Sequence, residues 1–495
     1  MKFSNALLNF FSFEGNATSW SPKNKPVLRF YNTLSEETEV FAPLSPREVK
    51  MYNCGPTVYD EQHIGNLKPY IFADTLRRTL NLFGYKVKQV INITDVGHLV
   101  SDADTGEDKM EASAKKTGKS AQEIAQHITE LFFADLDLVG IDRSKIKFPR
   151  ATEFISEQIA LVKSLEEKGY AYKISDGMYF DTAKFKDYGK LGHIDLEGLK
   201  EGARVEENAE KKNPHDFALW KFSKKGEKRQ QEWSSPWGVG FPGWHIECTA
   251  MIFALLGRQI DIHTGGIDHI PVHHNNEIAQ AEAITKKQYV KYWMHGAFIT
   301  IEGKKISKSL GNTIYLHNIV DKGYSPRALR YLFLTSHYRS PMNFTWEAVA
   351  GADQALKRLT RQYLELKADS NGTTEDQGFK KDFYAALAED LDTPRALARL
   401  WELIKDDTVS PVAKKKSIEL ADKVFGLGIT DTRTTAKLSV IEESNLPQDV
   451  QALLRDREAA RKEKDFKKAD ELRKEIEEKG FDIKDTPEGA QVVKK

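Results

Sequence analysis

The hydrophobic pattern near the start of the chain predicts a strand, a helix and a second strand. Apolar and polar positions alternate over residues 49–54 (VKMYNC), as they do in a strand, and Gly55 follows. Residues 70–83 carry apolar side chains at helical spacing, and 87–94 (VKQVINIT) again has the pattern of a strand. Such a β-α-β unit places both strands parallel in one sheet, and ligands then bind where the strands end.

The middle of the chain interrupts this α/β pattern. Residues 121–170 have helical periodicity, whereas 171–240 contain short strand-like pieces, loops and paired charges. Beyond them the α/β pattern resumes in two helical and two strand-like segments, which are 247–256, 276–284, 260–264 and 295–301. We therefore expect a nucleotide-binding type of fold that an inserted segment splits into two halves.

The remainder of the chain is predicted to be almost wholly helical. From Ile319 onward helical spacing dominates, and we interpret the interruptions at 369–378 and between Gly428 and Pro447 as linkers. Residues 448–479 are predicted to form an amphipathic helix that ends at Gly480. Its apolar face would hold Leu454, Phe466, Ala469, Leu472 and Ile476.

Composition narrows the class of protein. The 495 residues suffice for about three domains, and 73 Lys plus Arg balance 73 Asp plus Glu, so no overall charge indicates a nucleic-acid partner. No apolar run approaches the roughly 18 residues of a membrane helix, and the first 20 residues lack the features of a signal peptide. We therefore expect a cytoplasmic protein in which any contact with nucleic acid is local.

The two cysteines, Cys54 and Cys248, are candidates for chemistry. In a reducing compartment such a pair is more often unpaired, metal-bound or catalytic than a structural disulfide. Taken without their neighbours, the two residues would most often be buried bystanders.

Two loops have the composition of a triphosphate site. His63 and Asn66 (HIGN) stand just ahead of a predicted helix, whose N-terminus suits phosphate and where an imidazole can donate to it. Further on, GKKISKSLGN (303–312) is a glycine-bounded loop whose Lys305 and Lys308 can follow a phosphate as its charge grows. Each loop taken alone is equally compatible with an ordinary exposed loop.

Taken together and in this order, HIGN and KISKS resemble the two signatures of class I aminoacyl-tRNA synthetases. Further blocks run in the order of the bacterial cysteinyl-tRNA synthetase family from about Leu28 to Lys495; they are NCGPTVYD, NITD, RATEFI, GARV, NPHDFALWK, PGWHIECTAM, HHNNEIAQ and HYRSPMNFT. The resemblance implies an α/β fold: a Rossmann-type parallel-sheet catalytic domain split by a connective insertion and followed by all-α C-terminal domains. It also implies ATP-dependent adenylation of L-cysteine and transfer of cysteine to tRNA(Cys), with Mg²⁺ accompanying ATP.

The resemblance gives both cysteines a common purpose. Family zinc ligands map onto Cys54, Cys248, His273 and Glu277, which implies one zinc ion per chain. Zinc binds thiolate and lowers the pKa of a thiol, so a metal-bound substrate thiol would separate cysteine from serine where shape alone could not. The alternative is a closed structural zinc site, although its ligands normally cluster at C-x₂₋₄-C spacing.

Other residues carry family roles by matched position. The cysteine pocket maps onto Gly55, Thr57, Thr94 and Trp244, with His245 nearby. The nucleotide-binding positions are Gly65, Gly265, Gly266, Asp268 and Lys308. No covalent enzyme nucleophile is required, because the substrate carboxylate attacks the α-phosphate and the protein supplies position and charge.

The chain departs from the family pattern at four notable places, which are Asn66, Phe241, Thr264 and Asn275. Asn66 replaces a second histidine, and Phe241 replaces an arginine. Thr264 stands where a glycine is usual and could crowd the approach of adenosine. Asn275 replaces a carboxylate beside the mapped zinc ligands and could alter the charge around them.

We expect seven segments: 1–25, an extension of unknown role; 26–120 and 241–318, the catalytic halves; 121–240, the insertion; 319–427, a stem and helical bundle; 428–447, a linker; and 448–495, an anticodon-side domain. A monomer is expected. Two alternatives remain open, a cysteine–aminosugar ligase of the mycothiol type and a non-catalytic zinc-containing paralogue. The first gives no reason for a C-terminal domain, and the second is compatible with the four departures.

Overall fold

The structure is a computed structural model that describes most of the chain. The described residues are 25–97, 109–194, 208–224, 226, 229–366, 374–431, 440–441, 443, 446–463, 465–486 and 489–494. The predicted extension 1–25 lies outside them except for Lys25, as do the GARV block and parts of both predicted linkers.

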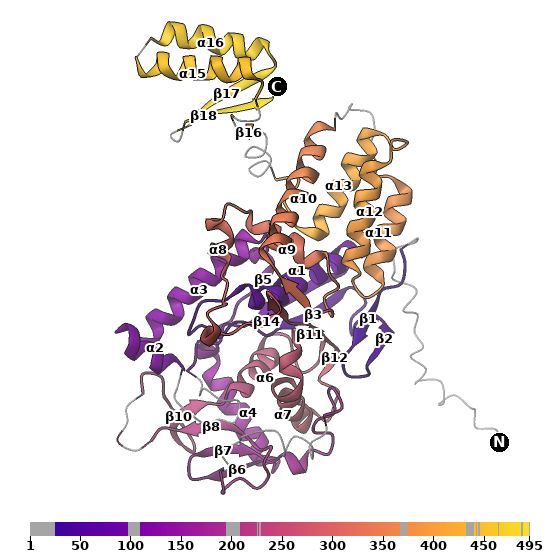
Figure 1. Cartoon of the computed structure of the whole chain (residues 1–495). Helices are drawn as coiled ribbons and strands as arrows, with labels where there is room; N and C mark the ends of the chain where they lie inside the picture. The colour runs from indigo at the N-terminus through magenta and orange to yellow at the C-terminus, as the bar shows by residue number, and fades with distance from the viewer. Residues whose placement is uncertain are drawn as a thin grey trace, which may run out of the picture.

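A five-stranded parallel sheet unites the two halves of the catalytic fold (Figure 1). Its order is β12-β11-β3-β4-β5, with bounds Val290–Gly296, Ile260–Gly266, Glu48–Asn53, Lys86–Ile91 and Ile146–Lys147. β11 pairs with β3 in the register Ile262↔Met51, although the two strands are separated by the whole insertion. The predicted split of a parallel-sheet fold into two halves is therefore confirmed.

Helices cover both faces of this sheet because neighbouring strand residues point to opposite sides. Met51 joins the core beneath α1 (Ile64–Leu82), whereas Tyr52 joins the core beneath α6 (Trp244–Leu255) and α7 (Asn275–Thr285). α1 begins earlier than the predicted residue 70 and includes Pro69 within its first two turns. The start of α1 at the end of β3 brings the HIGN loop to the carboxyl edge of the sheet.

The insertion contributes a second, antiparallel sheet. Its order is β6-β7-β8-β10-β9, with bounds Ala171–Ile174, Gly177–Phe180, Phe217–Phe222, Gly238–Pro242 and Trp233–Ser235. Three helices precede it: α2 (Lys109–Thr117), α3 (Ala121–Leu138) and α4 (Ile155–Glu167). α3 packs Phe132 against Tyr70 of α1, at 5.0 Å between ring centroids, so the first part of the predicted insertion shares the catalytic core.

Beyond β12 the chain forms a small sheet and then a helical bundle. The small sheet, β14-β13-β15, comprises Lys304–Lys305, Ile299–Ile301 and Met342–Phe344, while β1 (Arg29–Asn32) and β2 (Glu37–Val40) form a separate pair. The helices are α8 (Leu316–Asp321), α9 (Pro326–Leu334), α10 (Trp346–Glu365), α11 (Gln377–Ala388), α12 (Thr393–Lys405) and α13 (Pro411–Phe425). Short helical turns lie at Arg143–Lys145, Ala151–Phe154, Thr182–Lys184, Ile267–His269, Ile270–His274 and Lys308–Leu310.

The C-terminal domain differs from the predicted single helix and is not wholly helical. α15 (Gln448–Lys462) and α16 (Phe466–Glu478) are separate, because the Asp465 side chain accepts a hydrogen bond from the N–H of Lys468 and starts a new helix. A sheet of β16 (Val440–Ile441), β18 (Gly489–Lys494) and β17 (Phe481–Thr486) completes the domain. Leu454 and Ile476 are buried as predicted, whereas Phe466 is exposed.

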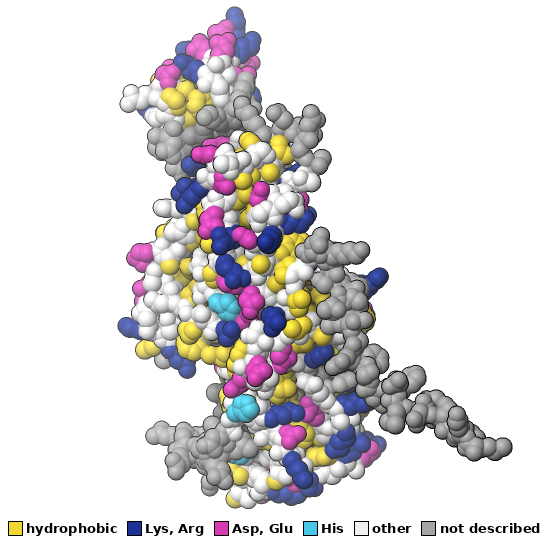
Figure 2. All heavy atoms as spheres, turned by 90° about the vertical axis from the view of Figure 1, so that its right-hand side faces the viewer, with side chains coloured by type: hydrophobic (Ala, Val, Ile, Leu, Met, Phe, Trp, Pro, Cys, Tyr) yellow, Lys and Arg dark blue, Asp and Glu magenta, His cyan; other side chains and the backbone are white. Residues whose placement is uncertain are grey.

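The surface agrees with the charge balance of the sequence. Figure 2 shows acidic and basic side chains interspersed over one face of the molecule. Among the described residues, no helix combines the length and the apolar character that a membrane span requires.

Candidate active site

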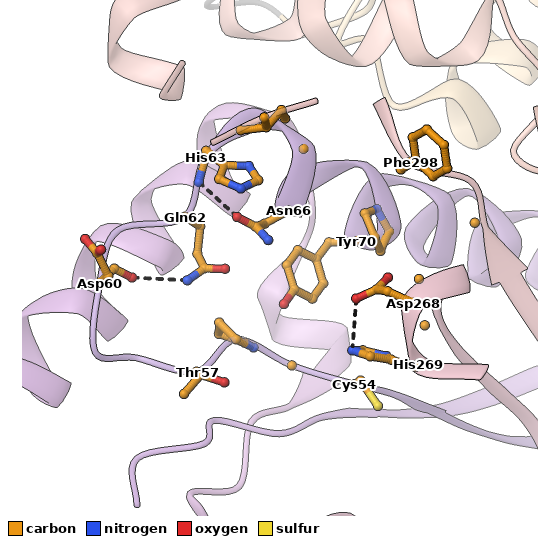
Figure 3. A pocket seen from close by; sticks show the side chains of 18 of the residues that line it. Cys54, Thr57, Asp60, Gln62, His63, Asn66, Tyr70, Asp268, His269 and Phe298 are labelled. Atoms are coloured by element: carbon orange, nitrogen blue, oxygen red, sulfur yellow. Dashed lines mark hydrogen bonds and ion pairs between the residues drawn. The ribbon is translucent and has the colours of Figure 1, made fainter. Parts of the chain in front are cut away.

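A cavity of about 870 Å³ opens at the carboxyl ends of β3, β11 and β12. Parallel sheets place ligand sites at this edge. Most of the predicted site residues line it: Cys54, Gly55, Thr57, His63, Gly65, Asn66, Trp244, Gly265, Gly266, Asp268, Lys305 and Lys308 (Figure 3). Thr94, Cys248, His273 and Glu277 lie outside its lining.

The four mapped zinc ligands meet beside this cavity. Cys54 follows β3, Cys248 lies on α6, and His273 and Glu277 lie on the turn at Ile270–His274 and on α7. One potential ligand atom from each lies within 4.8 Å of all the others. We call this set the Cys₂HisGlu cluster. An overlapping set keeps Cys54 and Glu277 and adds His263 and His274.

The carboxylate of Glu277 shows that the cluster fits a cation. Its Oε2 lies 3.1 Å from Nε2 of His263 and 3.4 Å from the Tyr289 hydroxyl. The buried Oε1 has no hydrogen-bond partner among the described residues, although Nε2 of His273 lies 3.2 Å from it. Two free thiols, an imidazole and a buried carboxylate oxygen this close together form a donor set that suits a metal ion such as zinc.

The protein sets most of the cluster in a charged state. Burial would raise the pKa of Glu277, but the charges of His263 and His273 hold it at about 2. The hydrogen bond between the two thiols lowers the pKa of Cys248 to about 6, whereas burial raises the pKa of Cys54 well above its usual value. One thiol therefore ionises readily, and a bound cation would be needed to ionise both.

The HIGN loop caps α1 at the edge of the cavity. The Asn66 side-chain oxygen accepts a hydrogen bond from the N–H of His63, the residue that precedes α1, at 3.2 Å (Figure 3). Burial lowers the pKa of His63, and its buried Nδ1 has no hydrogen-bond partner within the described part of the chain. His63 is thus a neutral imidazole with an uncommitted ring nitrogen beside a helix N-terminus, which suits contact with phosphate.

The two signature loops contact each other directly. A Cβ on Gly65 would lie 2.8 Å from Cδ1 of Ile306, so the absence of a side chain lets the KISKS loop pack on α1. Lys308 forms an ion pair with Asp60, which lies in the loop that leads to His63. Segments more than 200 residues apart therefore form one wall of the cavity. No pattern in the sequence singled out Asp60.

The other end of the cavity holds the mapped cysteine-pocket residues. The Trp244 ring packs against the His273 ring, with 4.5 Å between centroids and 33° between planes. A Cβ on Gly55 would lie 1.6 Å from the backbone oxygen of Asn92, so only glycine fits there. The buried Thr94 accepts a hydrogen bond from Asn92 at 2.9 Å and donates one to Glu247 at 3.2 Å. Asn92 in turn accepts a hydrogen bond from the Gly55 N–H at 2.7 Å, so Thr94 supports the Gly55 loop through Asn92.

The last two residues of β11, Gly265 and Gly266, lie where an added side chain would meet neighbouring side chains. A Cβ on Gly265 would lie 2.6 Å from Nδ1 of His269, and one on Gly266 would lie 2.2 Å from Oδ1 of Asp268. The Asp268 side chain is 81% exposed and borders the cavity. Thr264 is buried and accepts a hydrogen bond from Asn53 within the sheet, so its side chain does not narrow the cavity.

Comparison with known proteins identifies the family. Residues 40–354 match the catalytic domain of tRNA synthetases class I (C), and residues 443–492 match the cysteinyl-tRNA ligase anticodon binding domain. Cysteine–tRNA ligase 1 of Burkholderia lata is 47% identical over 94% of this chain and 96% of its own length. The Treponema denticola cysteine–tRNA ligase is 41% identical over 92% and 98%. This chain belongs to the cysteine–tRNA ligase family.

Solved structures agree on the fold. Mycobacterium tuberculosis methionyl-tRNA synthetase with methionyl-adenylate has a TM-score of 0.54 at 13% identity, covering 79% of this chain and 93% of that one. The LeuRS–tRNA–LeuAMS complex of Agrobacterium radiobacter has a TM-score of 0.56 at 12% identity, covering 80% and 85%. At these identities the likeness concerns the class I fold alone.

Two departures from the cysteine–tRNA ligase pattern have structural partners of their own. The guanidinium of Arg229 lies 3.7 Å from the ring centroid of Phe241, so a cation still reaches the neighbourhood of that position. The Asn275 amide donates to the carbonyls of Ile270 at 2.7 Å and Leu191 at 3.1 Å. It therefore ties the start of the turn at Ile270–His274 to Leu191.

Sequence reasoning also missed part of the histidine group around the cluster. His263, His274 and His295 follow one another in space: His263 and His274 have ring centroids 4.5 Å apart, and His274 Nδ1 lies 2.7 Å from His295 Nε2. The sequence feature that could have revealed this group is the concentration of histidines, since five of the 13 fall within residues 263–295.

Proposed function

We propose that this chain activates L-cysteine with ATP and transfers it to the 3′-terminal adenosine of tRNA(Cys), with a zinc ion in the Cys₂HisGlu cluster selecting the substrate. The observation that carries the proposal is one cavity that has Cys54 and the adjoining Cys₂HisGlu cluster at one end and the HIGN and KISKS loops, in contact with each other, at the other. Membership of the cysteine–tRNA ligase family supports the same reaction.

In the first step a carboxylate oxygen of cysteine attacks the α-phosphorus of ATP. A bond forms between that oxygen and phosphorus, the bond to the bridging oxygen breaks, and pyrophosphate leaves. His63 and the helix N-terminus behind it would stabilise the charge on the α-phosphate, while Lys305 and Lys308 would follow the departing pyrophosphate. Gly65, Gly265, Gly266 and Asp268 would hold the nucleotide, with Mg²⁺ bound to its phosphates.

In the second step a hydroxyl of the terminal adenosine attacks the carbonyl carbon of cysteinyl-adenylate. An ester bond forms, AMP leaves with the electron pair of the cleaved bond, and the hydroxyl proton is released. The C-terminal domain would read unpaired anticodon bases, since its family match is to an anticodon binding domain.

Selection of cysteine is assigned to the metal site. Cys54, Cys248, His273 and Glu277 would hold one zinc ion, and the chemistry that zinc supplies is a bond to a thiolate that a serine hydroxyl replaces poorly. Gly55, Thr57 and Trp244 would position the rest of the substrate, and Thr94 would act through the Gly55 loop.

The two alternative functions would not need all the parts of this structure. A cysteine–aminosugar ligase of the mycothiol type does not need the folded domain at 448–494, and a non-catalytic paralogue does not need both signature loops in contact. Cytoplasmic location is part of the proposal, supported by two free thiols at one site. The expectation of a monomer stays a prediction.

The deciding experiment is amino-acid-dependent exchange of pyrophosphate into ATP, with cysteine and serine compared before and after removal and return of zinc. Exchange with cysteine alone, lost on metal removal and restored by zinc, is expected. Absence of exchange in a folded, zinc-loaded sample would favour the non-catalytic alternative, and metal-independent exchange would overturn the role of zinc.

A further inference from the structure

The HYRSPMNFT segment (337–345) connects the helical bundle to the cavity, a role that the proposed function leaves unused. The Tyr338 ring is buried and stacks on Phe72 of α1, with 4.2 Å between centroids and 7° between planes. Its hydroxyl donates to Oδ1 of Asp390 at 2.7 Å, and its backbone oxygen accepts from the Ala297 N–H at 2.9 Å. Tyr338 thus touches α1, the bundle and the strand end at Ala297.

Lys68 also links the HYRSPMNFT segment to the residues after β12. This α1 residue is only 4% exposed, and its ammonium donates to the backbone oxygens of Ala297 at 2.8 Å and Ser340 at 3.0 Å. Both acceptors are neutral backbone carbonyls, and these compensate a buried positive charge less well than a carboxylate does. A buried cation kept on such partners indicates a purpose other than stability.

The held peptide forms part of the cavity wall. Ala297 and Phe298 both line the cavity, and Phe298 is 57% exposed. β12 pairs with β11 in the register Gly266↔Gly296, so the wall continues from the glycines assigned to the nucleotide. In Figure 3, Asp268 and His269 lie between Phe298 and Cys54, which places this wall away from the cysteine end.

Asp390 anchors the arrangement in the bundle. It lies in the turn between α11 and α12 with a left-handed backbone (φ 48°), as does Leu391 (φ 58°), a conformation that costs non-glycine residues energy. Its carboxylate accepts from the Tyr338 hydroxyl, from Nε of Arg339 at 2.7 Å and from the N–H of Tyr31 at 2.9 Å. Two of these donors hold the strained turn against the HYRSPMNFT segment, and the third ties it to β1.

We propose that Lys68 and Tyr338 are positioning residues for the nucleotide wall of the cavity at Ala297 and Phe298, and that Asp390 of the bundle holds Tyr338 in place. The assignment of this wall to the nucleotide rests on the proposed function. Neither Lys68 nor Tyr338 belongs to the Cys₂HisGlu cluster or contacts Trp244. Replacing either residue should therefore weaken binding of ATP and leave binding of cysteine unchanged.

The test measures the dissociation constant for ATP by calorimetry on the full-length, zinc-loaded protein, together with KM for ATP and for cysteine in pyrophosphate exchange. Tyr338→Phe and Lys68→Met are expected to weaken ATP binding by about fivefold or more, with KM for cysteine within about twofold of wild type. Lys68→Arg keeps donors for both carbonyls and should restore part of the loss. All measurements are made well below each variant's melting temperature.

Tyr331→Phe is the matched control, because Tyr331 accepts a hydrogen bond from Trp401 at 2.8 Å within the bundle and is not part of the cavity lining. Tyr338→Phe combined with Asp390→Asn should cost less than the sum of the two single effects, since both substitutions weaken the hydrogen bond between Tyr338 and Asp390. Unchanged ATP binding in Tyr338→Phe and Lys68→Met, or equal rises in both KM values, would overturn the proposal. If the wild-type protein binds ATP but does not catalyse pyrophosphate exchange, the proposed function is contradicted and the positioning role of Lys68 and Tyr338 is not. If the wild-type protein does not bind ATP, both are contradicted.

Discussion

Nδ1 of His245 lies 2.9 Å from Nδ1 of His273, and both rings are buried. This contact occupies the inner nitrogen of His273 and leaves Nε2 directed at Glu277, 3.2 Å from its Oε1. His245 therefore fixes the orientation of a proposed zinc ligand without being one, as outer partners of metal-bound imidazoles commonly do.

Replacement of His245 should weaken zinc binding. His245→Ala frees the His273 ring to rotate, and we expect a loss of zinc affinity of about 10- to 100-fold, measured by competition with a chromophoric chelator. His317→Ala serves as the control, because His317 pairs with Glu61 outside the cluster. Equal zinc affinity in both variants would show that His273 is oriented by other contacts.

The ion pair between Asp60 and Lys308 should compete with ATP for the lysine. Lys308 is 61% exposed, and such exposed pairs contribute little to stability. Asp60→Asn releases the ammonium, so KM for ATP should fall, by up to about fivefold. Glu61→Gln, which alters the neighbouring pair with His317, should leave KM for ATP unchanged. A raised KM in Asp60→Asn would mean that Asp60 itself assists nucleotide binding.

A buried charge cluster should dominate the stability of the interface between α1 and the bundle. Asp74 contacts Arg77, Arg78 and Arg330, and the Asp74 and Arg330 side chains are almost fully buried. Asp74→Asn leaves the Arg330 charge without its carboxylate and should lower the free energy of unfolding by about 3–5 kcal/mol in urea titrations at pH 7. Glu402→Gln, in the exposed pair with Arg399, should cost less than about 1 kcal/mol.

The same cluster predicts a dependence on acid. Burial would raise the pKa of Asp74, but the three arginines, Arg330 foremost, hold it at about 2, below the ordinary value of 3.8. A carboxyl with a lowered folded pKa stabilises the protein above the unfolded pKa and loses that contribution as pH falls through the folded one. The stability difference between wild type and Asp74→Asn should therefore narrow as pH falls from about 4 towards 2. A constant difference over that range would contradict the assignment.

Lys68 predicts a second gain of stability with rising pH, this time in the alkaline range. Burial lowers its pKa from 10.5 to about 8, so the charged form costs stability below pH 8 and that cost disappears as pH rises towards 10.5. Wild type should gain about 1–3 kcal/mol of unfolding free energy relative to Lys68→Met between pH 8 and 10. Urea titrations of both proteins across this range give the measurement, and parallel curves would contradict it.

Removal of residues 447–495 should separate the two steps of the reaction. The C-terminal domain has its own core, which includes Leu454, Ile476 and Ile483, so the remaining cores stay intact without it. We expect pyrophosphate exchange close to wild type and tRNA charging reduced by at least about 100-fold. Unchanged charging would contradict the role of the C-terminal domain in reading tRNA.

The chain order of the elements around the site was predictable because it is encoded locally. Alternation at 49–54 and helical spacing at 276–284 identify β3 and α7, and the separation of four residues between His273 and Glu277 brings both to one side of a helical segment. The break between α15 and α16 was missed, because one capping aspartate, Asp465, outweighed a continuous helical pattern.

The amino-acid sequence by itself determined the split parallel-sheet fold, the family and the set of candidate ligands, because periodicity and motif order are properties of the chain. Only the tertiary structure decided that Ile306 packs on Gly65, that Thr94 supports the cavity from behind, and that Lys68 and Asp390 converge on one segment. These contacts join residues far apart in the sequence, and their existence depends on how the sheet, the bundle and the loops pack in space.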